Sequence, residues 1–221
     1  MKTPGRILVL FVLVLLSVPA AVHALAVDKG IEVGANYANF RGQFADLADT
    51  KPKLGFVGGP FVGLRVAPDL TVQVEALYTM KGAKVETMLT DEAGNPLGLA
   101  TSFFNLSYLE VPLLLRASFL PASRVQPMLY LGPTLGFALS GRFHSDNAAI
   151  GDGKIDHLKP VDVGVAFGGG ASTRVGGLTL IGDFRYTTGF TDIYDIETSA
   201  FGLPRAESIN NVLSLMLGVG F

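Results

Sequence analysis

The chain has 221 residues, of which 49% are hydrophobic and 16% are charged, with 27 glycines and a formal net charge of -2. It contains no cysteine, which excludes a disulfide framework and thiol chemistry, and its charge offers no attraction to nucleic acid. This composition is too apolar for an ordinary secreted domain. Beyond the N-terminal segment, however, no apolar run approaches the roughly 20 residues of a spanning helix.

The N-terminus predicts a cleaved secretory signal peptide over residues 1–24. Lys2 and Arg6 precede an apolar run at 7–16, and small residues follow up to Ala24. Cleavage after Ala24 and cleavage after Ala26 both fit the spacing of small residues. A retained membrane anchor is the alternative, although the run is shorter than the roughly 20 residues that a spanning helix needs. The remainder, 25–221, is predicted to form one domain.

Eight segments alternate between apolar and polar or small residues with the period of a β-strand. They are 30–40, 54–66, 70–86, 101–119, 127–143, 160–175, 178–190 and 209–221. Most exceed the roughly 9–11 residues that a tilted strand needs to cross hydrocarbon. Because apolar residues alternate in a membrane barrel instead of running together, the composition and the missing helical span agree. The sequence therefore predicts an all-β protein, an eight-stranded antiparallel up-and-down transmembrane β-barrel.

The connections between these segments alternate strictly in length. Short connections are predicted at 67–69, 120–126 and 176–177, and long polar ones at 41–53, 87–100, 144–159 and 191–208. Outer-membrane barrels have short periplasmic turns and long outer loops. With the N-terminus inside, this pattern also leaves the C-terminus on the periplasmic side.

The two faces of the predicted strands differ in chemistry. One parity is apolar in every strand centre, whereas the other carries charged residues among many glycines. Every lysine after the signal segment is assigned to a loop or to a position near a strand end, so the strand-centre cations are all arginines. Arginine is preferred in enclosed ion pairs because its planar fork matches a carboxylate. The polar face is therefore predicted to point inward and the apolar face towards lipid.

We expect the inward charges to form an interlocked network that plugs the lumen. An eight-stranded barrel is just wide enough for side chains to fill, and a charge there is costly unless it is paired. Acidic and basic groups nearly balance in number. The predicted members are Glu32, Arg65, Glu75, Glu110, Arg116, Asp162, Arg174, Asp183 and Arg185. Two prolines inside strands, Pro112 and Pro133, are predicted to mark β-bulges.

One stretch, Tyr108-Leu-Glu-Val-Pro-Leu-Leu-Leu-Arg116, resembles the fourth strand of the PorT-like outer-membrane β-barrel family. The resemblance continues through Pro127–Ser140, Asp162–Gly170 and Asp183–Asp192 and covers most of the chain after the signal segment. It implies the barrel fold and an outer-membrane location, but no activity. One branch of the family takes part in protein secretion and gliding, and nothing in this sequence picks out that branch.

The C-terminal segment, Ile209–Phe221, is apolar at alternate positions and ends on an aromatic residue. It resembles the assembly signal of bacterial outer-membrane barrels, while the final strand of a β-sandwich is the alternative. In a barrel it pairs with the segment at 30–40 and places Phe221 against lipid at the periplasmic rim. The partners implied are outer-membrane lipid and, during biogenesis, the barrel-assembly machinery and periplasmic chaperones.

Candidate chemistry is confined to one loop. His144 and His157 flank 144–159, which also contains Asp146, Asp152 and Asp156 as possible metal ligands. Ser140 or Ser145 lies near His144 for a serine hydrolase arrangement. The spacing around Asp152 does not fit a calcium loop. We expect no cofactor, no metal and no catalytic site, and interpret this segment as a solvated loop.

Four functions remain open. The first is a non-enzymatic barrel that is structural or binds an unknown ligand or protein through its outer loops. The others are a narrow channel for small solutes, an accessory barrel of a secretion machine, and an outer-membrane lipid enzyme that uses His144 and His157.

Overall fold

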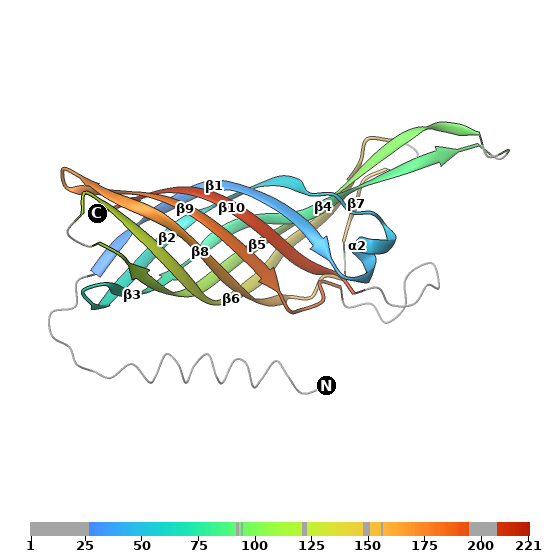
Figure 1. Cartoon of the computed structure of the whole chain (residues 1–221). Helices are drawn as coiled ribbons and strands as arrows, with labels where there is room; N and C mark the ends of the chain where they lie inside the picture. Colours follow the sequence, from blue (N-terminus) through green and yellow to red (C-terminus); the bar gives the residue numbers. More distant parts are fainter. Residues whose placement is uncertain are drawn as a thin grey trace.

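The computed structural model describes residues 27–91, 93, 95–120, 123–147, 151–155, 157–194 and 207–221. The segment predicted as a signal peptide, 1–24, lies outside the described residues, and its cleavage stays a prediction. Most of the predicted loop at 191–208 also lies outside them. The described chain is one antiparallel sheet, and its strands wind obliquely around a common axis (Figure 1).

The sheet closes on itself. Its strands are β1 (Val27–Arg41), β2 (Lys53–Ala67), β3 (Leu70–Glu75), β4 (Leu77–Thr90), β5 (Pro96–Ser118), β6 (Val125–Ser145), β7 (Gly153–Lys154), β8 (Val161–Val175), β9 (Leu178–Gly189) and β10 (Ile209–Gly220), and α2 spans Gln43–Leu47. β3 and β4 are consecutive segments that both pair with β2 on one side and β5 on the other, so they occupy one position in the ring. The two-residue β7 pairs only with β6. The ring therefore has eight members, as predicted.

The seam of the ring joins the two ends of the chain. β1 pairs with β10 without interruption, from Gly30 opposite Gly220 to Arg41 opposite Ile209. The backbone N–H of Phe221 donates to the Lys29 carbonyl at 2.9 Å, which extends the seam by one residue. The predicted pairing of the C-terminal segment with 30–40 is confirmed, and the β-sandwich alternative is wrong, because this pairing leaves neither strand as an edge.

Prolines interrupt the hydrogen bonding of the sheet without shifting its register. The bulges predicted at Pro112 and Pro133 are wrong, since both residues pair in regular register; the shift in that strand pair lies at Ser107–Tyr108. Pro60 accepts from the Ala76 N–H at 3.0 Å but has no N–H to donate in return. β3 and β4 are separate at this point for that reason.

The described parts of the long connections lie at one end of the ring, called here the loop end, and those of the short ones at the opposite turn end (Figure 1). The predicted loop at 87–100 is largely wrong, because β4 and β5 continue as a paired ribbon to Thr90 and Pro96 and project beyond their neighbours. The predicted loop at 41–53 contains α2, and the one at 144–159 contains β7. Among the described residues, no helix is long and apolar enough to cross a membrane.

The side chains alternate across the wall of the ring as predicted. Ile31, Val33 and Leu217 are among the large hydrophobic side chains exposed on the outside, whereas Glu32 and Glu75 are buried inside. An apolar outer surface around a polar interior is the reverse of a soluble protein and is typical of a barrel in lipid. The charged residues of the strands are therefore collected in the lumen.

Candidate functional site

The middle of the lumen is organised around Arg185 of β9, whose side chain is 2% exposed. Its two terminal nitrogens donate to the two carboxylate oxygens of Glu75 at 2.5 and 2.9 Å. Asp183 lies at 3.4 Å and Glu32 at 3.8 Å from the same guanidinium. A two-point contact of this kind is the strongest arrangement that an arginine makes with a carboxylate. We call these four residues the Arg185 cluster, and three strands, β1, β3 and β9, supply them.

Tyr130 of β6 completes the environment of this cluster. The Arg185 guanidinium lies 5.1 Å from the centre of the Tyr130 ring, and its Nε donates to the phenolic oxygen at 3.3 Å. The Tyr130 hydroxyl in turn donates to Asp183. Gly168 on the neighbouring strand makes room, because a Cβ there would lie 2.5 Å from that hydroxyl oxygen. Two features of the sequence could have indicated this contact: Tyr130 occupies an inward-facing position of its strand, and β8 is rich in glycine.

A chain of hydrogen bonds connects the Arg185 cluster to the turn end. Gln73 donates to Glu75 at 2.7 Å and accepts from Arg116 at 2.8 Å. Arg116 also lies 3.7 Å from Asp28, which accepts from Arg65 at 3.2 Å. Arg65 and Arg116 are therefore near one another, but they stand at the mouth of the lumen and not at its centre.

A second buried charge cluster contains a lysine that the sequence analysis misplaced. Lys81 of β4 is 3% exposed, forms an ion pair with Glu110 and lies 3.7 Å from Asp162. Asn210 donates to Asp162 at 2.9 Å, and the Lys81 ammonium lies over the Tyr108 ring at 5.2 Å. The assignment of every lysine to a loop or a strand end is wrong here because β4 continues to Thr90. We call Lys81, Glu110 and Asp162 the Lys81 cluster.

The predicted network is thus divided, and its charges do not balance where they are buried. The five predicted carboxylates Glu32, Glu75, Glu110, Asp162 and Asp183 are all buried, and the cations in contact with them are Arg185 and Lys81. Arg174 joins neither cluster, because it lies exposed at the turn end and forms no ion pair with a described residue. The parity of a residue predicts that it points inward, but not how far it lies from the turn end or the loop end of the lumen.

An uncharged group of hydrogen bonds links three strands of the lumen wall. Asn36 of β1 donates to Thr79 at 2.7 Å and to the Met80 carbonyl at 3.1 Å on β4. Its side-chain oxygen accepts from Ser214 of β10 at 2.8 Å. All of its polar atoms are therefore satisfied although Asn36 is 1% exposed. Asn36 shares the inward parity of Glu32, which was the signal that could have found it.

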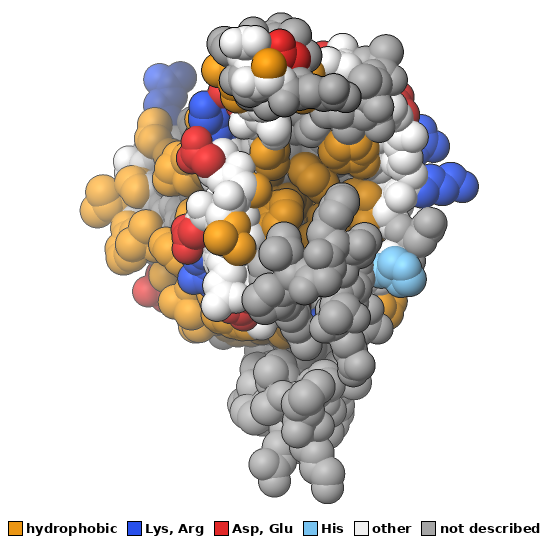
Figure 2. Space-filling model, turned by 90° about the vertical axis from the view of Figure 1, so that its right-hand side faces the viewer, with side chains coloured by type: hydrophobic (Ala, Val, Ile, Leu, Met, Phe, Trp, Pro, Cys, Tyr) orange, Lys and Arg blue, Asp and Glu red, His pale blue; other side chains and the backbone are white. Residues whose placement is uncertain are grey.

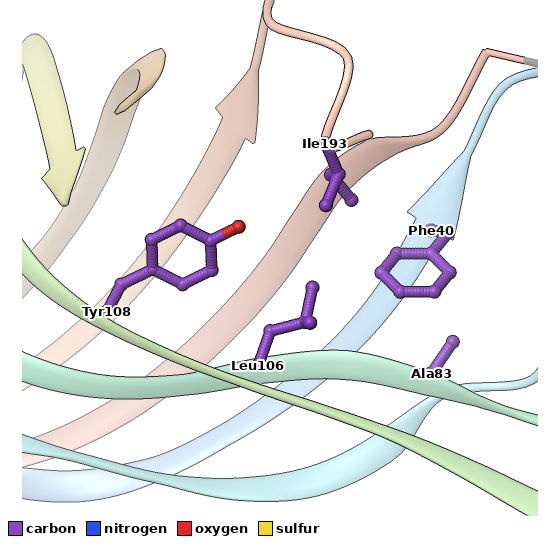
Figure 3. Packing of buried hydrophobic residues seen from close by; sticks show 5 residues of the cluster. All are labelled: Phe40, Ala83, Leu106, Tyr108 and Ile193. Atoms are coloured by element: carbon purple, nitrogen blue, oxygen red, sulfur yellow. The ribbon is translucent and has the colours of Figure 1, made fainter. Parts of the chain in front are cut away.

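Apolar side chains fill the lumen at the loop end. Figure 3 shows five of them directed towards one another, four from strands of the wall and Ile193 from the loop after β9, and we call this group the loop-end cluster. Its members are Phe40, Ala83, Leu106, Tyr108 and Ile193. Phe44 of α2 packs edge-on against Phe40 and Phe104, with ring centres 6.2 and 5.9 Å away. Hydrophobic atoms are visible in the middle of this end of the molecule (Figure 2).

The β4–β5 ribbon that projects from the loop end is tied down at its base. Lys51 and Lys84 both donate to the Glu86 carboxylate, at 2.5 and 3.1 Å. The hydrogen bond raises the pKa of Lys51 and lowers the pKa of Glu86 from their usual values, so each favours the charge of the other. Further out, Met88 and Leu99 stand opposite one another and are both exposed.

The two loop histidines, His144 and His157, are both exposed at the surface. His144 contacts Asp152 at 2.7 Å on the surface, and Asp156 lies outside the described residues. No group of three or more His, Cys, Asp and Glu side chains in the ranges that the structure describes is placed to hold a metal ion. The Ser145 hydroxyl lies 3.5 Å from the Ser102 hydroxyl, and the Ser145 backbone N–H donates to Asp152 at 3.3 Å.

Comparison with known proteins identifies the family. A model described as outer membrane protein beta-barrel domain matches residues 23–195, which is 173 of the 221 positions. The chain belongs to this family. Its location is therefore the bacterial outer membrane, with transmembrane strands that expose the apolar face described above. The match is to the broad domain and does not distinguish the PorT-like branch. A search of curated proteins found no match.

Several solved structures are similar to this chain at low sequence identity. Neisserial surface protein A is 18% identical with a TM-score of 0.46, covering 87% of this chain and 97% of that one. Ail of Yersinia pestis, in complex with the heparin analogue sucrose octasulfate, is 12% identical with a TM-score of 0.41, covering 88% and 99%. The outer membrane protease OmpT of Escherichia coli is 10% identical with a TM-score of 0.35, covering 91% and 99%.

Proposed function

We propose that the protein is a non-enzymatic outer-membrane barrel with a lumen closed to solutes, and that it acts through the surface at its loop end. The observation that carries this proposal is the sequence of groups along the lumen. The Arg185 cluster, the Lys81 cluster and the loop-end cluster succeed one another from the turn end to the loop end. Each draws side chains from several strands.

The space between these groups supports a closed lumen. The cavity that touches both Lys81 and Arg185 has a volume of about 10 Å³, enough for roughly one water molecule. A solute would have to separate buried ion pairs to pass, which leaves charges without partners in a medium of low dielectric constant. The narrow channel, the alternative function, would require both clusters to open.

The loop end offers the surface for binding. The β4–β5 ribbon exposes Met88 and Leu99 as a directly opposed apolar pair. Exposed apolar groups on a projecting element are typical of contact sites for other molecules. We therefore expect a ligand or protein partner to cover Met88 and Leu99.

The remaining alternatives have weaker support. The stretch 108–116 that resembles the PorT-like family places Tyr108, Glu110 and Leu114 inside the lumen, where they serve packing and ion pairing that any closed barrel needs. This location favours no secretion partner. A lipid enzyme would need His144 and His157 to act together, whereas His144 pairs with Asp152 and stacks on Phe103 at the surface.

Conductance in planar bilayers tests the closed lumen. The wild-type protein is expected to give current at the level of the protein-free bilayer, and regular single-channel steps would refute the proposal. The double variant Arg185→Ser, Glu75→Ser removes both members of the central pair together and should raise the conductance. Arg142→Ser, an exposed arginine at the loop end of β6, is the matched control and should leave it unchanged.

Binding through the loop end is tested separately. Met88→Ser, Leu99→Ser should abolish capture of an outer-membrane or extracellular partner by the purified barrel without affecting its folding. A partner that is captured equally well by this variant would place the binding surface elsewhere.

A further inference from the structure

A cavity of about 520 Å³ opens at the turn end of the barrel. Its size falls within the range of small-molecule pockets, about 300–1,000 Å³. Residues from β1, β2, β3, β5, β6, β8, β9 and β10 line it, so it occupies the whole mouth of the ring at this end. We call it the turn-end cavity. It is separate from the loop-end surface on which the proposed function rests.

The cavity opens at the turn end but is closed at its inner end, so it is not the entrance of a channel. Phe61 and Ile181 line it, and with Met128 they form a buried apolar group. On their strands Met128 and Ile181 come two residues before Tyr130 and Asp183, one step nearer the turn end. This apolar floor therefore separates the cavity from the Arg185 cluster, and the Arg116–Gln73–Glu75 hydrogen bonds pass beside it.

The charge of the wall selects an anion. Three arginines, Arg65, Arg116 and Arg174, line the cavity. Among its described lining residues, a single side chain, that of Asp28, is acidic. Asp28 accepts from Arg65 and lies 3.7 Å from Arg116, so one carboxylate is shared between two guanidiniums. The Nε of Arg116 is buried without a hydrogen-bond partner, and Arg174 forms no ion pair with a described residue.

The arrangement of donors points to a phosphate group. The three arginines come from β2, β5 and β8, and each of these strands is separated from the next by one position in the ring. Hydroxyl groups of Thr71, Ser118 and Ser172 also line the cavity, and Thr71 lies between Arg65 and Arg116. A carboxylate presents two oxygens in one plane, whereas a phosphate presents oxygens in several directions and suits donors that surround it. Arginine forks are a preferred partner of phosphate.

From this geometry we infer that the turn-end cavity binds a phosphate group carried by a small ester or a lipid headgroup on the periplasmic side of the membrane. Arg174 contacts the ligand from β8, Arg65 and Arg116 contact it from β2 and β5, and Asp28 orients those two guanidiniums. Both candidate ligands, the small ester and the lipid headgroup, present a phosphate oxyanion. They differ in that the lipid also carries acyl chains.

Binding of inorganic phosphate to the full chain in alkyl maltoside micelles, which contain no phosphate, tests the inference. Calorimetry should show saturable binding. Arg174→Gln should weaken it about tenfold, which corresponds to the loss of one charge-assisted contact. Arg65→Gln combined with Arg174→Gln should abolish it. Arg142→Gln removes the same charge from the loop end and should bind phosphate as the wild type does.

Arg174 and Arg142 are both exposed, so neither variant should disturb folding; heat-modifiable migration on gels verifies this. Absence of saturable phosphate binding to the wild type would overturn the inference. An equal loss in the Arg174 and Arg142 variants would also overturn it, since only net charge would then matter.

A competition with short-chain phosphatidylglycerol distinguishes the two sources. Displacement of bound phosphate by this lipid, at a concentration where short-chain diacylglycerol has no effect, identifies a lipid headgroup. Failure of the lipid to displace phosphate, with displacement by glycerol phosphate, identifies a soluble ester. Both results support the phosphate site.

Discussion

Arg185 and Glu75 meet across the lumen in a two-point ion pair, with contacts of 2.5 and 2.9 Å, although 110 positions separate them in the chain. Two further carboxylates, Asp183 and Glu32, share the same guanidinium. Arg185 is therefore the one cation in this cluster, and the cluster depends on it more than on any single acid.

This asymmetry predicts an order of stability among the variants. Arg185→Leu leaves three buried carboxylates without their cation and should lower the free energy of unfolding by about 3–5 kcal/mol or more. Glu75→Leu should cost less, because Asp183 and Glu32 remain to neutralise Arg185. The double variant should be more stable than Arg185→Leu alone. Urea unfolding in micelles measures the three values, and equal costs for the two single variants would contradict the arrangement.

Lys81 offers the same test at the second cluster, with a matched control nearby. Lys81→Met leaves Glu110 and Asp162 buried beside each other and should destabilise the barrel by about 3–5 kcal/mol. Addition of Glu110→Gln should recover part of that loss. Lys84→Met, at a position three residues further along β4 where the side chain is only partly buried, should have little effect on urea unfolding. If both lysine variants unfold alike, Lys81 is not the buried cation.

Gly168 tests the close approach of Tyr130. A Cβ at Gly168 would lie 2.5 Å from the Tyr130 hydroxyl oxygen and 2.3 Å from the Phe184 carbonyl oxygen. Gly168→Ala should therefore cost about 1–3 kcal/mol, the usual effect of overpacking. Gly182→Ala is the control, because a Cβ there meets no atom within 4 Å. Thermal unfolding of the two variants should differ clearly, and similar midpoints would show that β8 yields to the added methyl group.

Phe221 tests the assembly signal. Its side chain is exposed, with the Lys29 ammonium 5.5 Å from its ring centre at the seam. Deletion of Phe221 should lower the amount of protein in the outer-membrane fraction while the folded remainder keeps its stability. Phe119→Ala alters another exposed aromatic residue at the turn end and serves as the comparison. Normal yield after deletion would refute a role for Phe221 in assembly.

The predicted signal peptide is tested by intact mass. The protein isolated from outer membranes should lack residues 1–24 or 1–26, which gives two distinct masses. A protein that retains Lys2 and Arg6 would show that the apolar run at 7–16 stays attached as an anchor.

Several errors of the sequence analysis have a common origin in tertiary structure. The end of β4 was placed too early because the polar composition of 87–100 is typical of a loop, yet the two halves of that segment pair with each other. Lys81 consequently looked like a residue near a strand end. The charge balance failed for a related reason, since Arg65, Arg116 and Arg174 have the inward parity of the buried acids but lie near the turn end of their strands.

The sequence alone determined the number of strands in the ring, the face of each that meets lipid, and the pairing of the two ends of the chain. These follow from alternation with a period of two, which is a local property that each segment displays by itself. Only the tertiary structure decided which charges meet, which residues fill the lumen and where a cavity remains. Those contacts depend on the stagger of eight strands around a closed ring, and a shift of one strand along its neighbours changes every partner across the lumen.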